Sequence, residues 1–209
     1  QGHLRRQVAV QQPLLGRHEP GGAADPPVGF RAVEEEKESL GRLKMDIGVM
    51  EHISMMDILF LKEMKHVKNA WLRGADPEKL KKLRAAFLSE REQFENNLQA
   101  ASSSLKELAA GHEQEFSAFI TQLDALEQEH RAVTERYLAQ MDAHSGDAQA
   151  SDNKVEGLDR PVMAHIGELR DSFAAFTEQK AVEKLTLAEA DYAHRRNVIV
   201  IWILVSLSI

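Results

Sequence analysis

The sequence predicts an all-α protein built as an antiparallel, up-down-up-down four-helix bundle with long helices. Three observations favour this fold. The 209 residues are rich in Leu, Ala, Glu, Gln and Lys, with only 6% aromatic side chains. Apolar residues recur at three- and four-residue spacing along most of the chain. The breaks between the periodic segments are short, as in antiparallel bundles.

Composition also excludes several classes of function. The chain has no cysteine, which rules out a disulfide framework, a thiolate metal site and a thiol nucleophile. Its formal net charge is -7. A nucleic-acid binder would show a basic face instead, so no nucleic-acid partner is expected. No catalytic triad, phosphate-binding loop or nucleotide fingerprint occurs, and we expect neither enzymatic activity nor a cofactor.

Three parts are expected along the chain. Residues 1–30 contain four prolines and a Gly-Gly pair without an apolar period, which predicts a disordered or linker segment. Residues 31–194 carry the helical periodicity of the bundle. Residues 195–209 begin with two arginines and end in the uncharged run VIVIWILVSLSI. A membrane span needs roughly 20 apolar residues, so this run predicts the truncated start of a transmembrane helix, with a buried strand as the alternative.

The first helix is expected to end at Arg73, before Gly74 in the left-handed conformation of a helix end. The next helix is expected to start with Asp76 as N-cap and Pro77 in the first turn. Apolar residues of the first helix form two series with helical spacing, joined by a three-residue slip in phase. These series are Leu40, Leu43, Ile47 and Met50, and then Ile53, Met56, Phe60, Met64, Val67 and Trp71.

Three further helices are expected. The second covers Leu80 to Leu108 and breaks near Gly111. The fourth begins near Val155, after a polar loop over 142–154, and carries Pro161 in its first two turns, where a missing N–H costs least. The third has the clearest heptad pattern, with one histidine among its apolar positions: Phe116, Phe119, Leu123, Leu126, His130, Val133, Tyr137 and Met141.

Two stretches resemble a known family. Residues 60–77 (FLKEMKHVKNAWLRGADP) are similar to the end of the first helix in the four-helix-bundle sensor domains of bacterial methyl-accepting chemotaxis receptors and related transmembrane kinases. The part over 67–77 is the most specific. Residues 192–197 (YAHRRN), with the apolar run that follows, look like the entry into the second membrane helix of that family. Helix order and lengths agree over about 31–209.

The resemblance implies the extracytoplasmic sensor module of a chemotaxis receptor, a homodimer in the inner (cell) membrane with its bundle in the periplasm. A small ligand, such as an amino acid, an organic acid or an anion, would bind in the membrane-distal half. Binding would displace the last helix along its axis. The implied ligand site lies near Lys68, Asn69, Trp71 and Arg73. Alternatively, the basic residues only stabilise the helix C-terminus, and Trp71 belongs to the core.

A metal-carboxylate site is a weaker interpretation. Carboxylate and imidazole groups occur at i, i+3 spacing, which places both on one helical face, and di-iron bundles use this spacing. We expect no metal, with His130 as a hydrogen-bonded core residue and the other groups solvated. The candidates are Glu63, His66, Glu127, His130, His165 and Glu168.

A structural role is the second hypothesis. The chain would then be a tail-anchored tethering protein whose partner is another helix. A metal-carboxylate bundle with a redox or storage function is the third.

Overall fold

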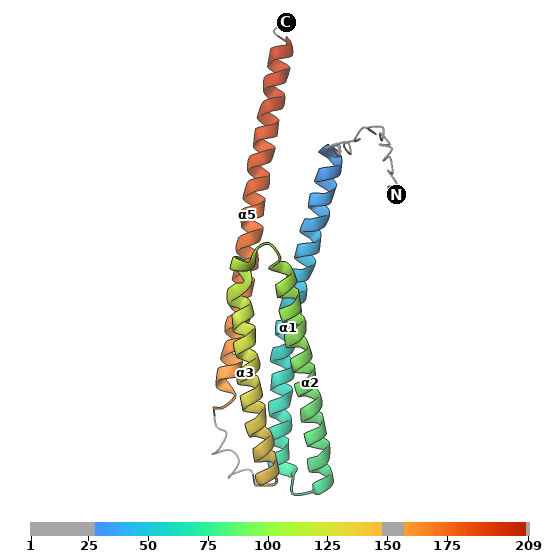
Figure 1. Ribbon diagram of the computed structural model, residues 1–209, viewed down its shortest axis with the longest axis vertical. Helices are drawn as coiled ribbons and strands as arrows, with labels where there is room; N and C mark the ends of the chain where they lie inside the picture. Colours follow the sequence, from blue (N-terminus) through green and yellow to red (C-terminus); the bar gives the residue numbers. More distant parts are fainter. Residues whose placement is uncertain (1–27, 148–156, 208–209) are drawn as a thin grey trace, which may run out of the picture. The chain divides into compact units, whose positions relative to one another are not determined.

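The computed structural model describes residues 28–147 and 157–207 (Figure 1). They form four helices: α1 (Val28–Arg73), α2 (Pro77–Leu108), α3 (Glu113–Ala143) and α5 (Arg160–Leu207). These described ranges contain no strand. The predicted all-α, four-helix-bundle architecture is therefore confirmed.

The chain divides into two units, Gln1–Glu38 and Ser39–Ile209. In the first unit, the described residues form the beginning of α1. The second unit holds the bundle, in which α3 packs against both α2 and α5 (Figure 1). Most of the predicted linker, and most of the predicted loop over 142–154, lie outside the described residues.

The turn between α1 and α2 forms for local reasons. The Asp76 side chain accepts hydrogen bonds from the backbone N–H groups of Glu78 and Lys79, at 3.0 and 3.3 Å. These bonds satisfy donors that the first turn of a helix leaves unpaired, and they lower the pKa of the Asp76 carboxyl. The predicted N-cap and the helix end at Arg73 are both confirmed.

The predicted conformation of Gly74 is wrong. Among the described residues, positive φ angles occur at Gly111, Gly146 and Gly157, but not at Gly74. The Gly74 N–H donates to the carbonyl of Ala70 at 2.8 Å, and a Cβ at this position would clash with that carbonyl oxygen. Close approach of the backbone, rather than a left-handed turn, therefore favours glycine here.

One apolar core joins the four helices. Its largest fully buried side chains include Phe60 of α1, Phe94 of α2, Leu126 of α3 and Phe173 of α5. All eight heptad positions predicted on α3, from Phe116 to Met141, are buried. The heptad pattern of α3 is thus confirmed as its core-facing side.

The two apolar series of α1 lie on different faces. Members of the downstream series, such as Ile53 and Phe60, are completely buried. In contrast, Leu43 and Ile47 are 54% and 51% exposed. The slip in phase therefore marks the point where the apolar face of α1 changes from the surface to the core.

The last helix, α5, contributes to the core only near its beginning. It starts at Arg160 after a turn over residues 157–159, so the predicted start near Val155 is wrong. Pro161 lies in the first turn of this helix, within the two turns that were predicted for it. Val162, Ile166, Leu169 and Phe173 are buried, whereas residues 181–192 are all exposed. Among the described helices, none is long and apolar enough to cross a membrane.

Candidate functional site

The four predicted ligand-binding residues lie in different environments at the end of α1. Lys68 and Arg73 are exposed, and Asn69 is half-buried. Trp71 is buried in the core, where its ring meets Tyr137 of α3 edge-on, with 6.5 Å between the ring centroids. Only the exposed cations and the half-buried amide are therefore open to a ligand from solvent.

The Trp71 side chain contains one polar atom, the indole nitrogen. Its indole Nε1 is buried and has no hydrogen-bond partner among the described residues. An indole N–H can only donate, and a buried donor without an acceptor is costly. A ligand oxygen that accepts a hydrogen bond from this N–H would therefore contribute more binding free energy than a ligand oxygen at an exposed donor.

The strongest polar feature of the core is a carboxyl–imidazole pair that joins α1 to α3. The Nε2 atom of His130 lies 3.1 Å from Oε1 and 3.0 Å from Oε2 of Glu63. Glu63 is 0% and His130 1% exposed. The expectation that His130 is a hydrogen-bonded core residue is confirmed, whereas the expectation that Glu63 is solvated is wrong.

Aromatic rings pack against the imidazole of this pair. The His130 ring stacks on Phe94 of α2, with centroids 3.7 Å apart and an interplanar angle of 13°. Phe60 of α1 meets the same ring at 5.9 Å with an interplanar angle of 67°. Three helices thus form one apolar layer around a single hydrogen-bonded pair.

Burial keeps both members of the pair neutral at pH 7. It raises the pKa of Glu63 to about 9 and lowers the pKa of His130 to about 3. On α2, Arg91 opposes the shift of Glu63, and Glu95 opposes that of His130. The two groups are therefore joined by a hydrogen bond between neutral partners, and the tautomer of His130 decides which of them donates.

The other candidate metal ligands do not join this pair. His165 bonds through Nδ1 to Glu129 at 3.0 Å, and Glu127 pairs with Arg131 at 2.8 Å. Glu168 is exposed.

His66 is half-buried, and its Nδ1 atom has no hydrogen-bond partner among the described residues. Across residues 28–147 and 157–207, no group of three or more His, Cys, Asp or Glu side chains could hold a metal ion. Of the six candidate ligands, only Glu63 and His130 come together.

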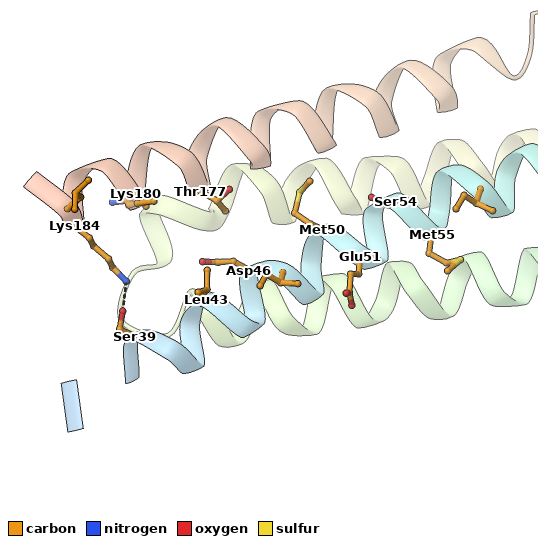
Figure 2. A pocket seen from close by; sticks show the side chains of 14 residues that line it. Ser39, Leu43, Asp46, Met50, Glu51, Ser54, Met55, Thr177, Lys180 and Lys184 are labelled. Atoms are coloured by element: carbon orange, nitrogen blue, oxygen red, sulfur yellow. Dashed lines mark hydrogen bonds between the residues drawn. The ribbon is translucent and has the colours of Figure 1, made fainter. Parts of the chain in front are cut away.

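A groove of about 880 Å³ lies between α1 and α5, and Figure 2 shows the side chains that line it. The upstream apolar series of α1 forms much of one wall, and the middle of α5 forms the other. The sequence pattern shows this series but does not reveal that it faces a groove. The lining residues are Ser39, Leu43, Asp46, Ile47, Met50, Glu51, Ser54, Met55, Ile58, Thr177, Lys180, Ala181, Lys184 and Leu185.

Charge is divided between the two walls. Asp46 lies on α1, and burial raises the pKa of its carboxyl, against the opposing effects of Lys184 and Arg42. On α5, Lys184 lies 3.3 Å from the Ser39 hydroxyl, and Lys180 forms an ion pair with Glu115 at 2.9 Å. The groove therefore has apolar walls with acidic groups on α1 and basic groups on α5.

No protein-family model matches the chain, and neither a curated protein nor a solved structure matches it. The resemblance of residues 60–77 to chemotaxis-receptor sensor domains stays a prediction.

Proposed function

We propose that the chain is the extracytoplasmic sensor module of a chemotaxis receptor or a related transmembrane signalling protein, and not an enzyme. The observation that carries this proposal is the continuity of α5. One unbroken helix, Arg160–Leu207, joins the buried residues of the bundle to an exposed apolar end that includes Ile199 and Ile201. A shift of its buried half is passed along the helix to that end, which we place at the membrane.

An antiparallel, up-down-up-down arrangement is part of the proposal. Residue numbers rise along one helix and fall along its neighbour in the contacts of α1 with α2 and of α3 with α5. They rise together in the contacts of α1 with α3. The supporting contacts are His52–Asn97 and Phe60–Phe94, then Glu115–Lys180 and Glu129–His165, and finally Glu63–His130 and Trp71–Tyr137.

The proposed ligand is a small anion such as an amino acid or an organic acid. Arg73 and Lys68 supply exposed positive charge at the end of α1, and the Arg73 guanidinium suits a carboxylate. Asn69 adds a donor and an acceptor. The unmet N–H of Trp71 lies in the core, so a ligand reaches it only through a change in the packing of this helix end. Binding would change the packing at this end of the bundle and displace α5.

A thermal-shift screen with aspartate, malate, succinate and phosphate tests the site. We expect at least one of these anions to raise the melting temperature of the chain. The shift is lost in Arg73→Ala and kept in Lys106→Ala, which removes an exposed cation at the other end of α2. No shift with any anion, or an equal shift in Arg73→Ala, contradicts the proposed site.

A homodimer is also proposed, with a second copy covering the groove between α1 and α5. Leu40, Ile47 and Leu61 are exposed apolar residues of α1 that fit one heptad repeat, as expected for a helix that packs against a partner helix. The acidic groups on the α1 wall and the lysines on the α5 wall suit the same partner. When α1 of a second copy enters the groove, its acids approach these lysines.

A tethering protein is the second candidate, because the same apolar groove also suits a helix from a different protein. The two candidates differ in their response to ligand. A tether shows no thermal shift with any small anion.

A further inference from the structure

We infer that the Glu63–His130 hydrogen bond fixes the axial register of α1 against α3, so that these two helices move as one body and α5 shifts against them. The register part stands on the geometry of the pair alone. The part that concerns α5 rests on the proposed function.

The geometry of the pair restricts sliding. Both carboxyl oxygens of Glu63 lie within 3.1 Å of the same nitrogen of His130. Sliding by one residue of an α-helix moves a side chain by about 1.5 Å along the axis. A 3.0 Å bond directed from one helix to the other lengthens to about 3.4 Å in such a step, outside the usual range of about 2.7–3.2 Å, so sliding weakens this contact.

The surroundings make a broken contact costly. Both members of the pair are buried, the His130 ring lies against Phe60 and Phe94, and these apolar rings cannot replace a lost hydrogen bond. The stacked ring of Phe94 also holds the His130 imidazole in its plane. Any other register would therefore leave two polar groups unsatisfied inside the core.

A second contact keeps the same alignment further along. Trp71 and Tyr137 meet edge-on about two turns beyond the pair, with 6.5 Å between centroids. The sequence separation is 66 residues here and 67 at the Glu63–His130 pair, so both contacts fit one register.

The contacts of α5 are of a different kind. Its polar contacts with α1 are between partly exposed side chains, such as Arg170–Asp57 at 3.6 Å. Exposed ion pairs are weak. Its contacts with α3 include the edge-on Phe119–Phe173 contact at 5.3 Å and the hydrogen bond of His165 to Glu129 at 3.0 Å, in which the Glu129 side chain is 44% exposed. None of these contacts is a buried, directional hydrogen bond like that of α1 with α3.

Distance measurements between two spin labels by double electron–electron resonance test the register. The chain contains no native cysteine, so Lys65→Cys on α1 and Asp124→Cys on α3 place spin labels at two exposed sites. These sites are about eight residues apart along the bundle, which makes their distance sensitive to sliding. We expect one narrow distance in the otherwise unchanged chain, and also with Glu63→Gln, which keeps a hydrogen bond to His130.

The decisive variant is Glu63→Met with His130→Leu, which replaces both polar groups by apolar ones. Replacing a buried polar pair by apolar side chains of similar size usually preserves folding, and here it removes the hydrogen bond that we infer fixes the register. We expect a broadened or shifted distance together with an unchanged helical circular dichroism spectrum.

If this variant does not fold, Glu63→Leu with His130→Met gives the same test in a differently packed core. A distance as narrow as in the unchanged chain, in either folded double variant, overturns the inference. Because the measurement uses no ligand, its failure and the failure of the proposed sensor function are separate results.

Discussion

At the scale of single residues, the buried pair gives the molecule a defined pH range of stability. Glu63 has a pKa of about 9 in the folded chain against 4.5 for an exposed glutamate, so its contribution to stability is complete below pH 4.5 and is lost as pH rises towards 9. His130 has a pKa of about 3 against 6.5, so its contribution is complete above pH 6.5 and is lost as pH falls towards 3. Between pH 4.5 and 6.5 the two slopes cancel, and stability from the pair is greatest.

Glu63→Gln is expected to remove the alkaline loss of stability. The unchanged chain should lose at most about 1.4 kcal/mol of unfolding free energy per pH unit from this group between about pH 6.5 and 9. The variant has no proton to lose and should show a plateau over that range. Urea unfolding at pH 6.5 and 8.5 measures the difference. Glu92→Gln, at an exposed position of α2, is the control and should behave like the unchanged chain. An equal slope in Glu63→Gln contradicts the account of the pair.

Sequence reasoning succeeded for one member of this pair and failed for the other. His130 occupies a heptad position, so the pattern of its own helix predicts burial. Glu63 is next to the core positions of α1, and its partner lies 67 residues away. The rotation of α1 relative to α3 decides whether Glu63 is buried, and a pattern within one helix does not contain that rotation.

At the scale of elements, the ends of helices were easier to predict than their faces. The Asp76 cap depends on hydrogen bonds to groups two and three residues away, so the local sequence determines it. Which apolar series of α1 enters the core depends on three other helices. The upstream series looks like a core series in the sequence and yet lines the groove, with Ile47 half exposed.

Ile47→Cys tests whether a second copy covers this groove. The chain has no native cysteine, so a disulfide can form only between introduced residues. Mild oxidation should give mainly a cross-linked dimer, because Ile47 lies at the proposed contact between two α1 helices. Glu92→Cys, exposed on α2, is the matched control and should stay largely monomeric on a non-reducing gel. Equal cross-linking of the two variants, or a monomer by light scattering before oxidation, contradicts the proposed face.

At the scale of the whole molecule, the sequence predicted the all-α class because helical periodicity and short breaks are local properties. It did not predict the groove or the buried pair, since both arise where separate helices meet. The four proposed ligand residues show the same limit. Their spacing on α1 is visible in the sequence, but the burial of Trp71 against Tyr137 depends on α3.

The central claim is that a small anion displaces α5 against a fixed pair of helices. Spin labels at Lys65→Cys on α1 and Ala175→Cys on α5 measure that displacement, with Lys65→Cys and Asp124→Cys as the reference pair on α1 and α3. With the anion that gives the largest thermal shift, the α1–α5 distance should change by on the order of 1–2 Å, and the α1–α3 distance should stay the same. An unchanged α1–α5 distance, or an equal change in both pairs, contradicts the claim.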